Sequence, residues 1–155
     1  MAKESTIEVV ATNRKAGRDY ELFDRWEAGL ALTGTEIKSI RRRSVNLNDS
    51  FARISRGGEV FLYNCRISPY AQGNRFNADP VRTRKLLLHR QEIERLVGMT
   101  ARKGYSLIPT RMYLKHGLAK VELALGKGRR EYEKRDVIRR DETRRELEQA
   151  QRQRR

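Results

Sequence analysis

Three basic side chains, Lys38, Arg41 and Arg42, are spaced so that they could bind phosphate groups together. Residues three and four apart share one face of a helix, so these cations would form a single patch. Thr33 and Glu36 have the spacing of a capping box, in which a hydroxyl and a carboxylate satisfy free backbone N–H groups at a helix start. The sequence therefore predicts a short cationic helix, suited to contact with a nucleic-acid backbone.

The residue types that usually carry catalysis or bind metals occur singly. His89 and His116 lie in different predicted elements, and Cys65 falls within an apolar strand pattern. Glu27 and Glu36 could form a carboxylate pair for metal-dependent cleavage of RNA, but a capping role for Glu36 and an ion-pairing role for Glu27 explain them more simply. No Walker loop, His-Glu-x-x-His motif or Rossmann glycine pattern occurs. We therefore expect no catalytic residue, no metal, no cofactor and no enzyme activity, with a nuclease as one alternative hypothesis.

Composition points to a polyanionic partner. The 155 residues carry a net charge of +15, and nucleic acid is the commonest partner of so basic a chain. An anionic membrane would require an amphipathic helix with bulky apolar residues, which the sequence lacks. The single cysteine fits a reducing compartment, and neither a signal peptide nor an apolar run of membrane-spanning length is present. We expect a cytoplasmic protein that does not bind membranes.

The remaining sequence is dominated by patterns typical of short strands. Apolar and polar residues alternate, and Gly57-Gly58 has the composition of a tight hairpin turn. A second helix, with apolar residues at Ile93 and Leu96, would end at Gly98. The expected extended ranges are 6–12, 19–32, 51–54, 59–67, 105–115 and 118–125, with a basic turn at 13–20 and a mobile loop at 71–80.

The order of these elements predicts a mainly β fold. No strand–helix–strand alternation is sustained, which argues against a doubly wound sheet. We expect a small closed or partly open β-barrel with two or three short α-helices, and an OB-like barrel is a known platform for oligonucleotides. The pattern alone leaves a closed barrel and an open sheet as alternatives. On the strand at 105–115, the residues expected to face the core are Ile108, Met112 and Leu114.

The composition changes at Gly126-Lys127-Gly128, which we interpret as a hinge. Residues 126–155 hold 12 Lys and Arg but 7 Asp and Glu, a net +5, which leaves +10 in residues 1–125. The segment lacks an apolar stripe, so we predict a barrel domain, 1–125, and a basic tail, 126–155, that is disordered alone and helical on a polyanionic surface. Four acid–arginine pairs at four-residue spacing would support that helix: Glu131/Arg135, Asp136/Arg140, Asp141/Arg145 and Glu148/Arg152.

Two stretches within the predicted strand and cationic helix, Glu27-Ala28-Gly29 and Gly34-Thr35-Glu36-Ile37-Lys38-Ser39-Ile40-Arg41, resemble the signature of bacterial small protein B. That family binds SsrA RNA, also called transfer-messenger RNA (tmRNA). Residues 82–88 also match, and the resemblance covers about residues 5–148. It implies an OB-like closed β-barrel. The RNA-binding residues that it implies are Asn13, Arg14, Lys15, Arg18, Tyr20, Glu27, Lys38, Ser39, Arg41, Arg82, Arg84 and Lys85.

The resemblance also implies a role for the tail. In the family, a flexible tail becomes helical in the vacant messenger channel of a stalled ribosome and senses the absence of messenger near the decoding centre. By this resemblance Tyr132 could stack on a ribosomal base, and Glu133 stands where the family commonly has Asp. The tail residues that match the family motif are Gly128, Tyr132, Glu133, Lys134 and Arg135.

The function implied by the resemblance is that of a non-enzymatic adaptor in trans-translation. As a monomer, the barrel would bind the tRNA-like part of tmRNA. The complex, aminoacylated by alanyl-tRNA synthetase and delivered by elongation factor Tu, would enter the A site of a stalled ribosome, where the tail would meet small-subunit ribosomal RNA. A second alternative, besides the nuclease, is a ribosomal or rRNA-maturation protein that binds ribosomal RNA without tmRNA.

Overall fold

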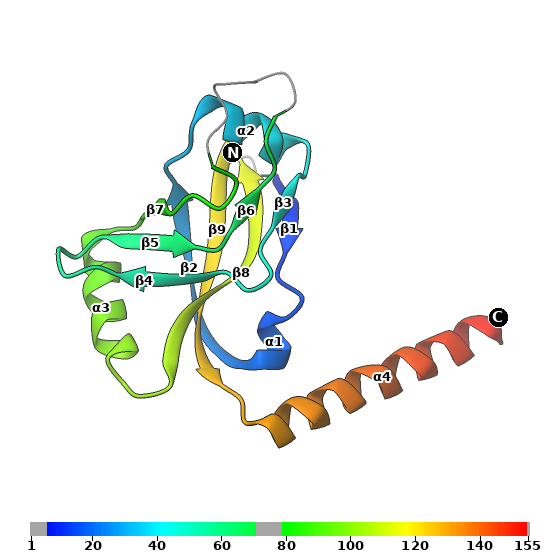
Figure 1. Cartoon of the computed structure of the whole chain (residues 1–155). Coiled ribbons are helices and arrows are strands. Elements are labelled where there is room, and N and C mark those ends of the chain that lie inside the picture. Colours follow the sequence, from blue (N-terminus) through cyan, green and yellow to red (C-terminus); the bar gives the residue numbers. More distant parts are fainter. Residues whose placement is uncertain (1–5, 71–78, 155) are drawn as a thin grey trace, which may run out of the picture.

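The computed structural model describes residues 6–70 and 79–154, which are mainly β with a few helices, as predicted (Figure 1). The helices are α1 (Ala16–Asp19), α2 (Gly34–Arg41), α3 (Arg90–Thr100) and α4 (Glu131–Gln153). The strands are β1 (Ile7–Thr12), β2 (Tyr20–Leu30), β3 (Val45–Asn46), β4 (Phe51–Ile54), β5 (Val60–Tyr63), β6 (Arg66–Ile67), β7 (Arg84–Leu87), β8 (Tyr105–Lys115) and β9 (Leu118–Gly128).

Seven strands form one antiparallel sheet in the order β1-β8-β4-β5-β7-β2-β9, and β3 pairs separately with β6. Strand β9 pairs with β8 as well as with β2, so the pairing β8-β4-β5-β7-β2-β9-β8 returns to its first strand. We call these six strands the strand ring. The turn between β8 and β9 is His116-Gly117, both with positive φ, as a tight hairpin requires.

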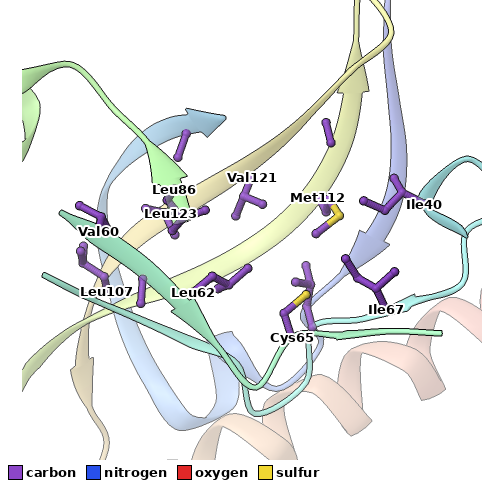
Figure 2. Packing of buried hydrophobic residues seen from close by; sticks show 14 of the residues in the cluster. Ile40, Val60, Leu62, Cys65, Ile67, Leu86, Leu107, Met112, Val121 and Leu123 are labelled. Atoms are coloured by element: carbon purple, nitrogen blue, oxygen red, sulfur yellow. The ribbon is translucent and has the colours of Figure 1, made fainter. Parts of the chain in front are cut away.

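The apolar core lies inside the strand ring (Figure 2). On β9 every second residue faces inward, and Val121 and Leu123 are fully buried. Each such side chain stabilises the fold by roughly 1.5–3 kcal/mol relative to an exposed one. Cys65 is also buried there, and burial raises the pKa of its thiol to about 11. The thiol therefore stays neutral and packs as a small apolar group, as its strand context predicts.

Strand β8 changes its inward face along its length. The register with β9 shifts between Pro109 and Arg111, a β-bulge. Because side chains alternate with a period of two, one extra residue exchanges the two faces. Met112 and Leu114 belong to the core cluster, as predicted. Before the bulge Leu107 joins that cluster, whereas Ile108 is also buried but packs outside it.

Several predicted boundaries are wrong. Residues 16–19 form α1 where the sequence predicts a turn, and Asn64, with a φ of 59°, separates β5 from β6 within the predicted strand 59–67. Helix α3 continues through Gly98, since glycine costs a helix only ~1 kcal/mol and Leu96 is fully buried beside it. Most of the loop predicted at 71–80 lies outside the described residues.

The hinge predicted at 126–128 is instead the end of β9. Gly128 pairs with Tyr20 on β2, so the sheet continues past the predicted domain boundary. A Cβ at Gly126 would lie 3.1 Å from the Cβ of Tyr20 and 3.2 Å from a side-chain carbon of Ile108. A larger residue here would push these neighbours apart by a few tenths of an ångström, so glycine favours the close packing between strands. Among the described residues, no helix is long and apolar enough to cross a membrane.

Candidate nucleic-acid interface

Helix α2 begins with the predicted capping box. The Thr33 N–H donates to Glu36 Oε1 at 2.9 Å, and the Glu36 N–H donates to Thr33 Oγ1 at 3.4 Å. The helix turns Glu36 and Ile40 inward and leaves Lys38 and Arg41 exposed. The predicted cationic face of this helix is therefore open to a ligand.

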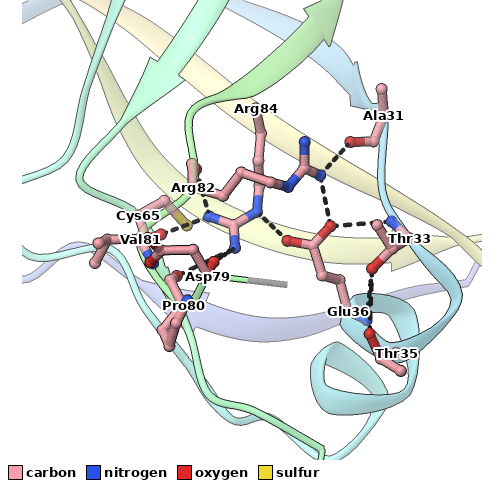
Figure 3. Close-up of polar contacts among 10 residues, drawn as sticks. All are labelled: Ala31, Thr33, Thr35, Glu36, Cys65, Asp79, Pro80, Val81, Arg82 and Arg84. Carbon is pink, nitrogen blue, oxygen red and sulfur yellow. Dashed lines mark hydrogen bonds and ion pairs between the residues drawn. The ribbon is translucent and has the colours of Figure 1, made fainter. Parts of the chain in front are cut away.

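Beneath that face, Glu36 is bound by two arginines (Figure 3). Arg84 Nε donates to Glu36 Oε2 at 2.6 Å, and an Arg82 terminal nitrogen donates to Glu36 Oε1 at 2.6 Å. Arg84 is fully buried. Its guanidinium also donates to the carbonyl oxygens of Cys65 at 2.7 Å, Arg82 at 2.9 Å and Pro80 at 3.1 Å.

The geometry places two of the predicted RNA-binding residues inside the protein. Arg84 is fully buried and directs its hydrogen bonds to protein groups, which fits a structural role. Ser39 is buried on the inner side of α2. Arg82 keeps about a third of its side chain exposed, and Lys85 is exposed on β7. These two remain candidates for RNA contact.

The charge of Glu36 is maintained despite its burial. Burial alone would raise the pKa of Glu36, but hydrogen bonds from Arg82, the Thr33 N–H and Arg84 outweigh that effect and lower it. The carboxylate thus links α2 to β7 and to the segment preceding β7. Its two partners also occupy the oxygens that a catalytic metal would need, and no cluster of metal-ligating side chains occurs among the described residues.

Tyr70 adds an aromatic surface beside α2 that the sequence patterns did not indicate. The Arg42 guanidinium lies 4.7 Å from the Tyr70 ring centroid, and Lys38 Nζ lies 5.4 Å from it. Arg42 also donates to the Tyr70 hydroxyl at 3.4 Å. Cations held over a ring have fewer conformations to lose on binding, so Tyr70 positions this part of the cationic face.

Glu27 lies on the outer side of β2 and is held by residues of β8. It accepts hydrogen bonds from the Tyr113 hydroxyl and, at 3.5 Å, from Lys115 Nζ. The bond from Tyr113 is the main cause that lowers the pKa of Glu27. Glu27 also lines a shallow hollow of about 290 Å³ with Leu87, which is 52% exposed, and Lys120. Leu87 was not among the predicted site residues, although it lies in residues 82–88, which match the family. Its position on the outer face of β7 is the signal that could have identified it.

The predicted residues around α1 lie at the other end of the molecule. Strand β2 runs from α1 to α2, so the two groups are separated by its length (Figure 1). Arg14 and Lys15 are exposed, and Arg18 and Tyr20 are half-buried. Asn13 is buried, and its amide nitrogen donates to the Pro109 carbonyl at 2.9 Å. Asn13 therefore fixes the turn, while its cationic neighbours face outward.

The tail starts beside α1 and then projects away from the sheet (Figure 1). The Arg129 N–H donates to the Asp19 carbonyl at 2.9 Å, and Lys134 Nζ lies 3.9 Å from the Asp19 carboxylate. Tyr132 is 59% exposed and Arg135 is exposed. Along its described length α4 buries no residue. The tail is helical in this structure, whereas the sequence predicts disorder in the absence of a partner.

Comparison with known proteins identifies the family. A family model described as SmpB protein matches residues 10–153. The SsrA-binding protein of Bacillus subtilis (strain 168) is 57% identical over 142 residues, which cover 92% of this chain and 90% of the relative. That of Thermoanaerobacter pseudethanolicus is 57% identical over 148 residues, covering 96% of this chain and 94% of the relative.

A solved structure agrees with these matches. The structure described as "tmRNA-SmpB: a journey to the center of the bacterial ribosome" aligns with a TM-score of 0.67 and 44% identity, covering 83% of this chain and 94% of that chain. The family is one of RNA-binding proteins and not of enzymes, which confirms the expectation from the sequence. Because the family model spans most of the chain and the relatives match more than half of the aligned residues, the chain belongs to the SmpB protein family.

Proposed function

We propose that this chain binds the tRNA-like domain of tmRNA and delivers it to the A site of stalled ribosomes. The observation that carries the proposal is the exposed cationic face of α2, held in place by the buried Glu36, in a chain whose relatives are SsrA-binding proteins. Lys38 and Arg41 would contact RNA phosphates, and Arg82 and Lys85 would extend that contact toward β7. Such recognition depends on RNA shape and backbone, as is usual for structured RNA.

The other partners act through the RNA in this proposal. Alanyl-tRNA synthetase would charge the tRNA-like domain, and elongation factor Tu would deliver the complex, which contains one copy of this protein. The site of action would be the cytoplasm. The strand ring would serve as an OB-like closed barrel, a proposal supported by the return of its strand pairing to β8.

The tail has a separate role in this proposal. It would enter the empty messenger channel near the decoding centre and contact small-subunit ribosomal RNA. Its exposure along α4 and its start at the α1 end, away from α2, support this division. The barrel unit would end with β9 at Gly128, three residues beyond the boundary predicted from composition. The tail residues proposed to contact the ribosome are Gly128, Tyr132, Glu133, Lys134 and Arg135.

The test measures how salt affects the affinity for tmRNA. Removing one phosphate-binding cation lowers the slope of log affinity against log salt by about one, so Lys38→Ala and Arg41→Ala should each weaken binding and flatten this slope. Arg90→Ala is the matched control, because Arg90 is an exposed cation on α3, outside the proposed interface.

Ribosomal RNA serves as the competing ligand in the same assay. The proposal requires that the wild-type chain prefer tmRNA at every salt concentration. If Lys38→Ala and Arg41→Ala leave the slope unchanged, the α2 face is not the interface. If the wild-type chain prefers ribosomal RNA, the ribosomal-protein alternative replaces the adaptor.

A further inference from the structure

A groove opens where β4 and β8 diverge. In the described sheet these strands pair only at Ala52 and Leu107. Beside that pair lies a hollow of about 410 Å³, a volume in the ordinary range for ligand pockets. We call this hollow the aromatic groove. Its lining residues are Tyr20, Phe51, Ala52, Arg53, Ile54, Thr100, Tyr105, Ser106 and Leu107.

Aromatic rings continue from the groove onto the strands on either side. Phe51 on β4 stacks on Tyr63 of β5, with ring centroids 5.2 Å apart and an angle of 12° between the planes. Tyr105 on β8 lies 6.0 Å from Phe23 of β2, whose side chain is 40% exposed. Two ring pairs, one on β4 and β5 and the other on β2 and β8, therefore each place one ring in the lining of the groove. Of the aromatic residues that line the groove, the predicted RNA-binding set includes only Tyr20.

Cations accompany these rings. The Arg53 guanidinium lies 4.9 Å from the Phe51 centroid, and Lys127 Nζ lies 5.9 Å from the Tyr105 centroid. Arg53 and Lys127 are both exposed. Rings with adjoining cations match the chemistry of a nucleotide, in which a flat apolar base is joined to an anionic phosphate.

We propose that the aromatic groove binds an unpaired nucleobase of RNA, with Arg53 and Lys127 contacting the adjoining phosphates. Paired bases keep their faces inside the helical stack, so only an unpaired base can offer a face to Tyr105 or Phe51. The proposal rests on the proposed function, because it assumes that RNA is the ligand. It adds a second, base-contacting subsite at the α1 end, distant from the backbone-contacting face of α2 (Figure 1).

The position of the groove connects it to the tail. Tyr20 lines the groove and pairs with Gly128, the last residue of β9 and the first of the proposed tail residues. An RNA held by the cations beside α1 or by the tail therefore lies near the groove. The unpaired base can come from tmRNA or from small-subunit ribosomal RNA, and both present the same chemistry.

The first experiment uses the full chain and an oligoadenylate of about ten nucleotides containing 2-aminopurine, whose fluorescence is quenched by stacking. We expect quenching by the wild-type chain and its loss in Tyr105→Leu, with about tenfold weaker binding, because the base loses one ring on which it stacks. A fully paired RNA hairpin is the second probe, and its affinity should change less than twofold. Equal losses on both probes, or unchanged quenching, would overturn the proposal.

Arg53→Ala gives a test that leaves the buried core unchanged, because Arg53 is exposed on β4. It should weaken the oligoadenylate complex severalfold, while Arg56→Ala, in the nearby exposed hairpin turn, should not. If the two variants weaken the oligoadenylate complex equally, the loss reflects net charge, and the proposal that the groove binds a base is refuted. A circular dichroism melt of each variant would show whether it is folded.

Two larger ligands distinguish the two possible sources of the unpaired base. Affinities of wild type and Tyr105→Leu for tmRNA and for isolated small ribosomal subunits would be compared, and a loss on one of them identifies the donor. If Lys38→Ala weakens tmRNA binding but Tyr105→Leu changes no affinity, the groove proposal fails and the proposed function stands. If neither variant affects any RNA, both fail.

Discussion

Arg82 and Arg84 are the same residue type, two positions apart, yet they have different roles. Arg84 is the first residue of β7, where inward and outward residues alternate, and it points inward together with Leu86. Its charge is balanced by Glu36 and its remaining N–H groups meet backbone carbonyls. The resemblance to the family implied that both arginines contact RNA. The period-two pattern with Leu86 was the signal that distinguished them.

Replacing Arg84 should therefore affect stability. Arg84→Met would leave the buried Glu36 with one arginine and would remove the guanidinium hydrogen bonds to three backbone carbonyls, so we expect a loss of about 3–5 kcal/mol in the free energy of unfolding. Urea titration measures it. Lys85→Ala, at the neighbouring exposed position, should change stability by less than about 0.5 kcal/mol. A stable Arg84→Met variant with weaker RNA binding would show that Arg84 contacts RNA.

The lowered pKa of Glu36 predicts acid sensitivity. In the unfolded chain its pKa returns to about 4.3, so between that value and the lower folded pKa the unfolded state binds more protons. The stability that Glu36 contributes is thus complete above its unfolded pKa and is lost as pH falls through its folded pKa. The difference in unfolding free energy between wild type and Glu36→Gln should shrink over that window. A difference independent of pH would contradict this.

At the scale of elements, the prediction was best where the signal is local. The capping box placed the start of α2 correctly, because its two hydrogen bonds join residues three apart. On β8, Ile108 was assigned to the same face as Met112 because the prediction applied one alternation to the whole strand, although Pro109 is a local sign of the bulge there. Helix α4 lacks a buried face, and packing on the sheet contributes little to it.

The tail should therefore lose its helix when it is separated from the protein and from RNA. Its four acid–arginine pairs supply only ~0.2–0.5 kcal/mol each, too little to offset helix nucleation reliably. Circular dichroism of a peptide of residues 129–155 should show weak helicity that rises when a polyanionic RNA is added. Strong helicity of the free peptide would contradict the proposal that RNA induces the helix.

At the scale of the whole molecule, the mainly β class followed from strand patterns, but the strand order did not. Strand β9 pairs with its hairpin neighbour β8, but its pairing with β2 joins segments about a hundred residues apart, and alternation cannot specify such a partner. For the same reason the predicted RNA-binding residues were given as one set, with no indication that they lie in two separate groups. The length of β2 instead places α1 and α2 at opposite ends of the molecule (Figure 1).

Two shortened chains test where the folded unit ends. A chain ending at Arg130 keeps β9 whole, and we expect an unfolding free energy within about 0.5 kcal/mol of wild type, because α4 buries no residue along its described length. A chain ending at Leu125 loses the β9 pairing of Gly126 to Gly128 and should be less stable by about 1–3 kcal/mol. Urea titration measures both. Equal stabilities would support the boundary at 125.

The late position of β9 has a consequence for synthesis of the protein itself. Ala28 pairs with Val121, so the strand ring cannot close until most of the chain has been made. In a chain released before Leu118, β2 would lack its β9 partner and one edge of β8 would be unpaired. Unpaired strand edges can form hydrogen bonds with strands of other chains. A chain that stops before β9 therefore leaves the strand ring open, whereas one that reaches Gly128 can close it. Closure by the last strand thus separates chains that contain the whole strand ring from shorter ones.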